Sequence, residues 1–181
     1  MKTVIDIETT IRIGGDGKKS PSPYIPENYL VSVGTGGEAE DKYLCFKHNT
    51  EPPTSYAIKI LQEILDKTTL LIGHNIKFDL SWLLECGFKY DGDVYDTMVY
   101  EYIKRGGLRY IKLNLAECCR RRKLPLKDDV PKSYMREGIG FEAMPWEIVE
   151  SYGKNDVYIT WLLYKCQGDE LNGNSSYAHS A

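Results

Sequence analysis

Apolar residues recur along the chain with two different periods, and these periods predict an alternation of strands and helices. Residues 2–7 form an apolar, β-branched run and predict a buried strand. Residues 29–33 and 42–46 predict two more strands, and the glycine-rich residues 34–37 between them predict the turn of a hairpin. Residues 69–72 predict another short strand.

Helix-period patterns occupy much of the remaining sequence. Thr54 is a candidate N-cap for a helix whose apolar stripe includes Ile58, Leu61 and Leu65. Further helices are predicted over residues 75–86, 96–104 and 112–122, and a long last helix over residues 145–166. Residues 13–17 and 20–23 predict a loop. This order predicts an α/β domain with a mixed central sheet flanked by helices.

Length and composition fit one globular domain with a substantial core, because 42% of the 181 residues are hydrophobic. We predict a domain over residues 1–168 and a disordered, polar tail over residues 169–181. No apolar run approaches the roughly 20 residues of a membrane span, so no membrane contact or signal peptide is expected. Five scattered cysteines without a C-x-x-C pair favour a reducing, cytoplasmic location.

The charge is unevenly distributed, although the net charge is only −3. Residues 104–132 contain ten lysines and arginines against three acids. Such a stretch can contact phosphate groups, and a solvated helix face is the alternative. The run from Arg120 to Lys123 matches no motif and is at most a general phosphate-binding patch.

Acidic residues occur in unusual settings near the beginning of the chain. Asp6 and Glu8 alternate with Ile5 and Ile7, so both carboxylates project from one face of the predicted strand. Carboxylates in a buried strand are costly unless they are paired or bind a cation. A salt-bridged pair is the alternative interpretation.

A second set of polar residues lies in the predicted helices. Asp79 lies in an apolar helix, and Tyr152 and Asp156 are spaced i, i+4, which places them on one helix face. Each has a structural alternative: Tyr152 fits a core aromatic residue, Asn75 fits an N-cap, and His74 fits a structural hydrogen-bonding residue. Asp96 fits a helix cap as well as a catalytic acid.

Together these segments resemble the three motifs of the DEDD (DnaQ-like) 3′–5′ exonuclease superfamily, in its tyrosine-bearing DEDDy branch. The resemblance is to the proofreading domain of DNA polymerase I-type and phage polymerases. Residues 6–10, 74–79 and 152–156 match the motifs in order, and the resemblance spans residues 2–168. A histidine-branch enzyme would place its base at Ser151, so Tyr152 favours the tyrosine branch. The resemblance implies a ribonuclease H-like fold.

The resemblance also implies roles for individual residues. Two Mg²⁺ or Mn²⁺ ions are expected, and an acidic site without nearby histidine or cysteine ligands suits such hard cations. Asp6, Glu8 and Asp156 would hold the first ion, and Asp6 and Asp79 the second. Tyr152 would orient the attacking water. The residues expected to contact the terminal nucleotide are Thr9, Thr10, His74 and Asn75.

The expected activity is the release of nucleoside 5′-monophosphates from single-stranded or frayed 3′ ends of DNA, with a polymerase as a candidate partner. Two alternatives stay open. One is an exoribonuclease, because the superfamily also contains ribonucleases. The other is a catalytically silent module that binds nucleic acid or docks to a polymerase.

Overall fold

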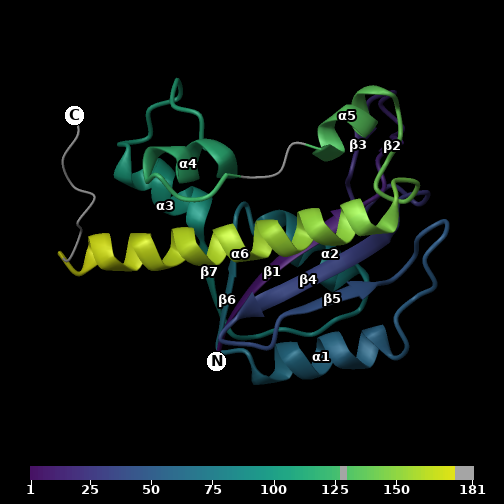
Figure 1. Cartoon of the computed structure of the whole chain (residues 1–181), viewed down its shortest axis with the longest axis horizontal. Coiled ribbons are helices and arrows are strands. Elements are labelled where there is room, and N and C mark those ends of the chain that lie inside the picture. The colour runs from purple at the N-terminus through teal and green to yellow at the C-terminus, as the bar shows by residue number, and fades with distance from the viewer. Residues whose placement is uncertain (127–129, 174–181) are drawn as a thin grey trace.

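A mixed five-stranded sheet forms the centre of the molecule (Figure 1). The computed structural model describes residues 1–126 and 130–173. The strand order is β5-β4-β1-β6-β7, in which β4 pairs antiparallel with β5 and β1, and β6 pairs parallel with β1 and β7. The strands are β1 (Lys2–Thr9), β4 (Leu30–Gly37), β5 (Lys42–Cys45), β6 (Leu70–Gly73) and β7 (Asp93–Asp96). The predicted α/β class with a mixed sheet is confirmed.

Helices cover both faces of this sheet (Figure 1). The long helix α6 crosses one face, where Val157 packs against Val4 and Ile72. On the opposite face α1 and α2 pack against Ile5 and Ile7. The helices are α1 (Ala57–Lys67), α2 (Lys77–Glu85), α3 (Thr97–Lys104), α4 (Leu115–Arg121), α5 (Val130–Arg136) and α6 (Trp146–Leu171). No helix in the described part of the chain is long and apolar enough to cross a membrane.

The alternation along β1 determines which way its acidic residues face. Ile5 and Ile7 belong to the core under α1 and α2, whereas Val4 packs under α6. Successive side chains on a strand point to opposite faces. Asp6 and Glu8 therefore share the face of Val4 and project toward α6.

The glycine-rich residues 34–37 are part of β4 and do not form the predicted turn. A Cβ atom at Gly34 would lie 2.9 Å from Val157 Cγ2, and one at Gly36 would lie 2.7 Å from Val157 Cγ1. Glycine is therefore used here for close packing between strand and helix, as glycine inside a strand often is. The turn prediction was wrong because the partner of these glycines lies far away in the sequence.

Two predicted helix caps were also wrong. α1 begins at Ala57, and the Thr54 hydroxyl instead accepts a hydrogen bond from the Cys45 amide at 3.0 Å. α2 begins at Lys77, and Asn75 precedes it in a left-handed conformation with φ 67°. The Asp96 carboxylate accepts hydrogen bonds from the Asn75 and Ile76 amides, and also caps the first turn of α3. Of the two alternatives for Asp96, the structure shows the helix cap.

Several short elements were not predicted. These are β7, α5 and a separate two-stranded sheet of β2 (Arg12–Ile13) and β3 (Lys19–Ser20). α4 begins at Leu115, after an N-cap at Asn114, and not at residue 112. α6 extends to Leu171, past the expected domain boundary at residue 168, and Glu170 near its end pairs with Arg122. Residues 174–181 of the predicted tail lie outside the described residues.

Candidate active site

Three carboxylates from the two ends of the chain converge between β1 and α6. Asp6, Glu8 and Asp156 each place one oxygen within 4.8 Å of the others. Asp156 is only 1% exposed, so its charge is largely removed from water. A donor set made of carboxylate oxygens fits Mg²⁺ or Mn²⁺, which prefer hard oxygen ligands. The three residues thus form a candidate cation site.

A close contact between α6 and the sheet brings Asp156 toward β1. The ring of Tyr43 lies against Gly153, where a Cβ atom would come within 2.3 Å of it. The Tyr43 hydroxyl donates to the Val149 carbonyl at 3.0 Å and lies 2.8 Å from the Ser32 hydroxyl. Sequence reasoning missed this contact. The available signal was Gly153, because a glycine inside a long helix usually has a packing reason.

Asp79 approaches the same site from α2. The pairing between β1 and β6 covers only residues 2–4 of β1, so α2 lies beside the next part of β1. The Asp79 carboxylate is 5% exposed and accepts a hydrogen bond from the Ile7 backbone. Burial, and next the negative charge of Asp6, raise the pKa of Asp79 well above its usual range, although the backbone hydrogen bonds oppose this. A cation would relieve the repulsion between these two acids.

Tyr152 adjoins the acidic cluster as a hydrogen-bond donor. Its hydroxyl donates to the Asp156 carboxylate, which lies one turn later on α6. Its ring packs against Phe141, with 5.6 Å between the ring centroids. Burial, followed by the charges of Asp156 and Glu8, raises the pKa of Tyr152 well above its usual range. The raised pKa favours the protonated hydroxyl, which can position a neighbouring group.

A cleft of about 690 Å³ opens over these residues. Asp6, Tyr152 and Asp156 line one part of it. Three basic side chains line the part formed by α4, α5 and the residues before α4, and these are Lys112, Arg120 and Lys132. Acids beside cations can accommodate a phosphodiester together with the cations that neutralise it.

Comparison with known proteins identifies the family of this chain. Residues 20–171 match the family described as 3′–5′ exonuclease. The chain belongs to the 3′–5′ exonuclease family. It is therefore a hydrolytic nuclease domain, and the matched range contains Asp79, Tyr152 and Asp156.

A curated relative of this exonuclease domain is DNA polymerase I of Aquifex aeolicus (strain VF5), 28% identical over 156 residues. The alignment covers 83% of this chain and 25% of that protein, so the chain spans about a quarter of its relative's length.

Solved structures show the same fold at low sequence identity. Brucella melitensis NrnC bound to pGG is 16% identical, with a TM-score of 0.65 over 96% of this chain and 76% of that one. The Aedes aegypti Nibbler EXO domain is 12% identical, with a TM-score of 0.61 over 95% of this chain and 79% of that one. The predicted ribonuclease H-like fold is confirmed.

The residues expected to touch the terminal nucleotide in this exonuclease domain have different surroundings. Thr9 and Thr10 are buried, and the Thr10 hydroxyl accepts a hydrogen bond from the Tyr29 amide at 2.8 Å. The ring nitrogens of His74 lie 2.8 Å from the Thr97 hydroxyl and 2.8 Å from the Leu113 carbonyl oxygen. These contacts give Thr10 and His74 structural roles, and His74 also lines the cleft.

Asn75 has surroundings that are better suited to substrate contact. It is exposed and lines the cleft. Its backbone is left-handed, and its amide donates a hydrogen bond to Asp96, so the position of its Cβ atom is fixed. Among the four residues expected at the nucleotide, Asn75 is thus the best placed.

Two arginines of the run from Arg120 to Lys123 have structural partners in this exonuclease domain, so only part of the run can serve as a phosphate patch. Arg122 is 3% exposed and pairs with Glu101 and Glu170, and Arg121 pairs with Glu101 at 3.1 Å. Arg120 points to the cleft, where it also pairs with Glu117. Lys127, in the wider basic stretch of residues 104–132, lies outside the described residues.

Proposed function

We propose that this exonuclease domain removes nucleoside 5′-monophosphates one at a time from single-stranded or frayed 3′ ends of DNA. The observation that carries the proposal is the convergence of Asp6, Glu8 and Asp156, from opposite ends of the chain, within 4.8 Å. The similarity to a DNA polymerase I favours DNA over RNA and makes a polymerase the candidate partner.

Two Mg²⁺ or Mn²⁺ ions are the proposed cofactors. Asp6, Glu8 and Asp156 would hold one ion, and Asp6 with Asp79 would hold the other. When bound, such ions favour deprotonation of water and neutralise charge on the phosphodiester. The raised pKa of Asp79 supports this assignment, because a buried acid beside another acid is stabilised by a nearby cation.

The protein side chains would orient the substrate. The protonated Tyr152 hydroxyl, already directed at Asp156, would position the attacking water. Lys112, Arg120 and Lys132 line the cleft and would contact backbone phosphates. Asn75, at the margin of the cleft, would contact the terminal part of the strand.

A gel time course with 5′-labelled single-stranded DNA and matching RNA tests the proposal. Each substrate is incubated with Mg²⁺, Mn²⁺ or EDTA, using the wild type and the Asp6→Ala variant. Asp66→Ala is the matched control, because Asp66 is an exposed acid on α1, on the other face of the sheet. We expect a cation-dependent ladder on DNA for the wild type and Asp66→Ala, and no ladder for Asp6→Ala.

The other outcomes point to other functions. A ladder on RNA alone would identify an exoribonuclease and reject the DNA assignment. Binding of DNA without any ladder would identify a catalytically silent module. A ladder that persists in Asp6→Ala would reject the proposed site.

A further inference from the structure

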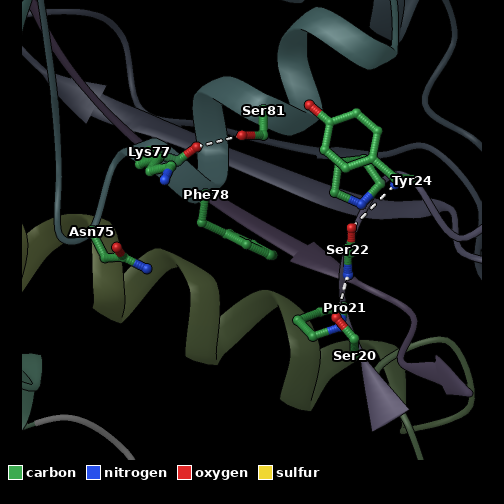
Figure 2. A pocket seen from close by; sticks show the side chains of 9 residues that line it. Ser20, Pro21, Ser22, Tyr24, Asn75, Lys77, Phe78 and Ser81 are labelled. Carbon is green, nitrogen blue, oxygen red and sulfur yellow. Dashed lines mark hydrogen bonds between the residues drawn. The ribbon is translucent and has the colours of Figure 1, made fainter. Parts of the chain in front are cut away.

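A second groove lies beside the catalytic cleft, between residues 20–24 and the first turns of α2 (Figure 2). Its volume is about 270 Å³, which is below the roughly 300–1,000 Å³ of sites for drug-sized ligands. Figure 2 shows the Phe78 ring extending from α2 toward Ser22, with Tyr24 at the far end of the groove. The groove therefore suits a small group such as a single base.

The wall formed by residues 20–24 is fixed by side chains from elsewhere in the fold. The Trp82 indole donates to the Pro21 carbonyl at 3.0 Å. The Asn28 amide donates to the carbonyls of Ser20 and Ser22 at 2.9 and 2.8 Å. Both tethers come from buried residues. A wall held in this way is pre-organised for binding.

Asn75 connects this groove to the catalytic cleft, because it lines both. A strand whose 3′ end lies beside Asp6 and Asp156 must leave the cleft past one of its margins. The margin at Asn75 borders the groove, because Asn75 lines both. An upstream nucleotide would therefore meet the groove without a change in the protein.

The chemistry of the groove suits single-stranded nucleic acid. Tyr24 is 70% exposed, and Phe78 is partly buried against the core. Aromatic faces of this kind allow bases to stack without selecting a sequence. Lys77 is exposed beside them and can contact a phosphate.

We propose that this groove is a subsite for the base of a nucleotide upstream of the one being removed, with Tyr24 and Phe78 as its stacking surfaces. The inference rests on the proposed function, because the strand direction follows from a 3′ end at the carboxylates. It assigns to residues 20–24 a role in binding the polymer and not in the chemical step.

The test uses 5′-labelled hexanucleotides, in DNA and RNA series, with one abasic residue placed in turn at each of the positions just upstream of the 3′ end. Affinity is measured by fluorescence anisotropy in EDTA, and kcat/KM is measured in Mn²⁺. We expect one abasic position to weaken wild-type binding by about tenfold, or about 1.4 kcal/mol, within the range for stacking of one base on an aromatic ring. The Tyr24→Ala variant should bind the intact oligonucleotide about tenfold more weakly and lose nothing further at that abasic position.

Tyr56→Ala is the matched control, because Tyr56 is 79% exposed and lines neither the groove nor the catalytic cleft. This control should bind like the wild type. Equal binding of all oligonucleotides by wild type and Tyr24→Ala would overturn the inference, as would independent losses from Tyr24→Ala and every abasic position. Failure of the proposed function appears separately, as an absence of cation-dependent cleavage by the wild type, while the binding measurement still decides the subsite.

Discussion

Two groups of ionisable side chains in the interior of this domain differ in composition. One contains only acids, and the other combines acids with an arginine. In the first, the acidic side chains of Asp6, Glu8 and Asp156 meet near that of Asp79. The second joins α3, α4 and α6 through opposite charges, where Arg122 pairs with Glu101 and Glu170. Both groups take acidic side chains out of water. In the second group Arg122 pairs with the acids, and for the first group we propose that divalent cations bind.

The pKa directions follow the same division. Burial and the charge of Asp6 raise the pKa of Asp79. Burial also acts to raise the pKa of Glu101, but its hydrogen bond and ion pair with Arg122 outweigh burial and lower it. The comparison teaches that buried charge alone does not indicate a functional site. A cluster of acidic side chains in which burial and a neighbouring acid raise a carboxyl pKa is the more informative feature.

Removing one acid from the first group should give the largest effect. Asp156→Asn should lower kcat/KM by more than about 100-fold, because changes in residues that only support metal ligands already cost about 10–100-fold. Cleavage assays check this point, with Asp66→Asn as control, and melting curves on the same preparation check that the variant is folded. A variant that keeps wild-type turnover would remove Asp156 from the site.

Breaking the second group should affect stability and leave cation binding intact. Arg122→Met should lower the free energy of unfolding by about 3–5 kcal/mol, because it leaves Glu101 buried without its main partner. Urea unfolding measures this loss. Lys59→Met, which removes only an exposed pair with Glu63, should change stability by about 0.5 kcal/mol or less. Similar losses in both variants would show that the Arg122 network contributes little.

The contributions of the two groups to the free energy of unfolding in EDTA should also change with pH in opposite directions. We expect these changes to be smaller than the effects of the substitutions above. Because the folded pKa of Glu101 is below its usual 4.5, its contribution to stability is present above pH 4.5 and lost as pH falls through the folded pKa. Because the folded pKa of Asp79 is above its usual 3.8, the contribution of Asp79 to stability is fully present below pH 3.8. This contribution is lost as pH rises through the folded pKa. At neutral pH, Glu101→Gln should therefore destabilise the protein and Asp79→Asn should stabilise it. Urea unfolding at neutral and acid pH checks this, and the same sign for both variants would contradict it.

Sequence reasoning predicted the elements whose patterns are local. The β-branched run of β1 and the helical period of α6 predicted the right elements. The i, i+4 spacing of Tyr152 and Asp156 predicted one shared helix face, and their side chains do lie together on α6. The convergence of Asp6, Glu8 and Asp156 agrees with the sequence resemblance.

The features that were missed depend on partners distant in the sequence. Gly34 looked like a turn residue because its packing partner, Val157, lies on α6. Arg122 looked like a phosphate ligand because Glu101 and Glu170 lie in other helices. β7 has only four residues and starts at an aspartate, so its pattern is too short to recognise.

The central claim is that cations stabilise the group of like charges and not the mixed group. Melting curves in EDTA and in Mn²⁺ at about 100 times the dissociation constant test it most directly. We predict that Mn²⁺ stabilises the wild type by about 2.7 kcal/mol, or about 5–10 °C for a domain of this size. Arg122→Met should melt at a lower temperature with the same shift, and Asp156→Asn should lose the shift. A wild type that does not respond to Mn²⁺, or an equal shift in Asp156→Asn, would contradict the account.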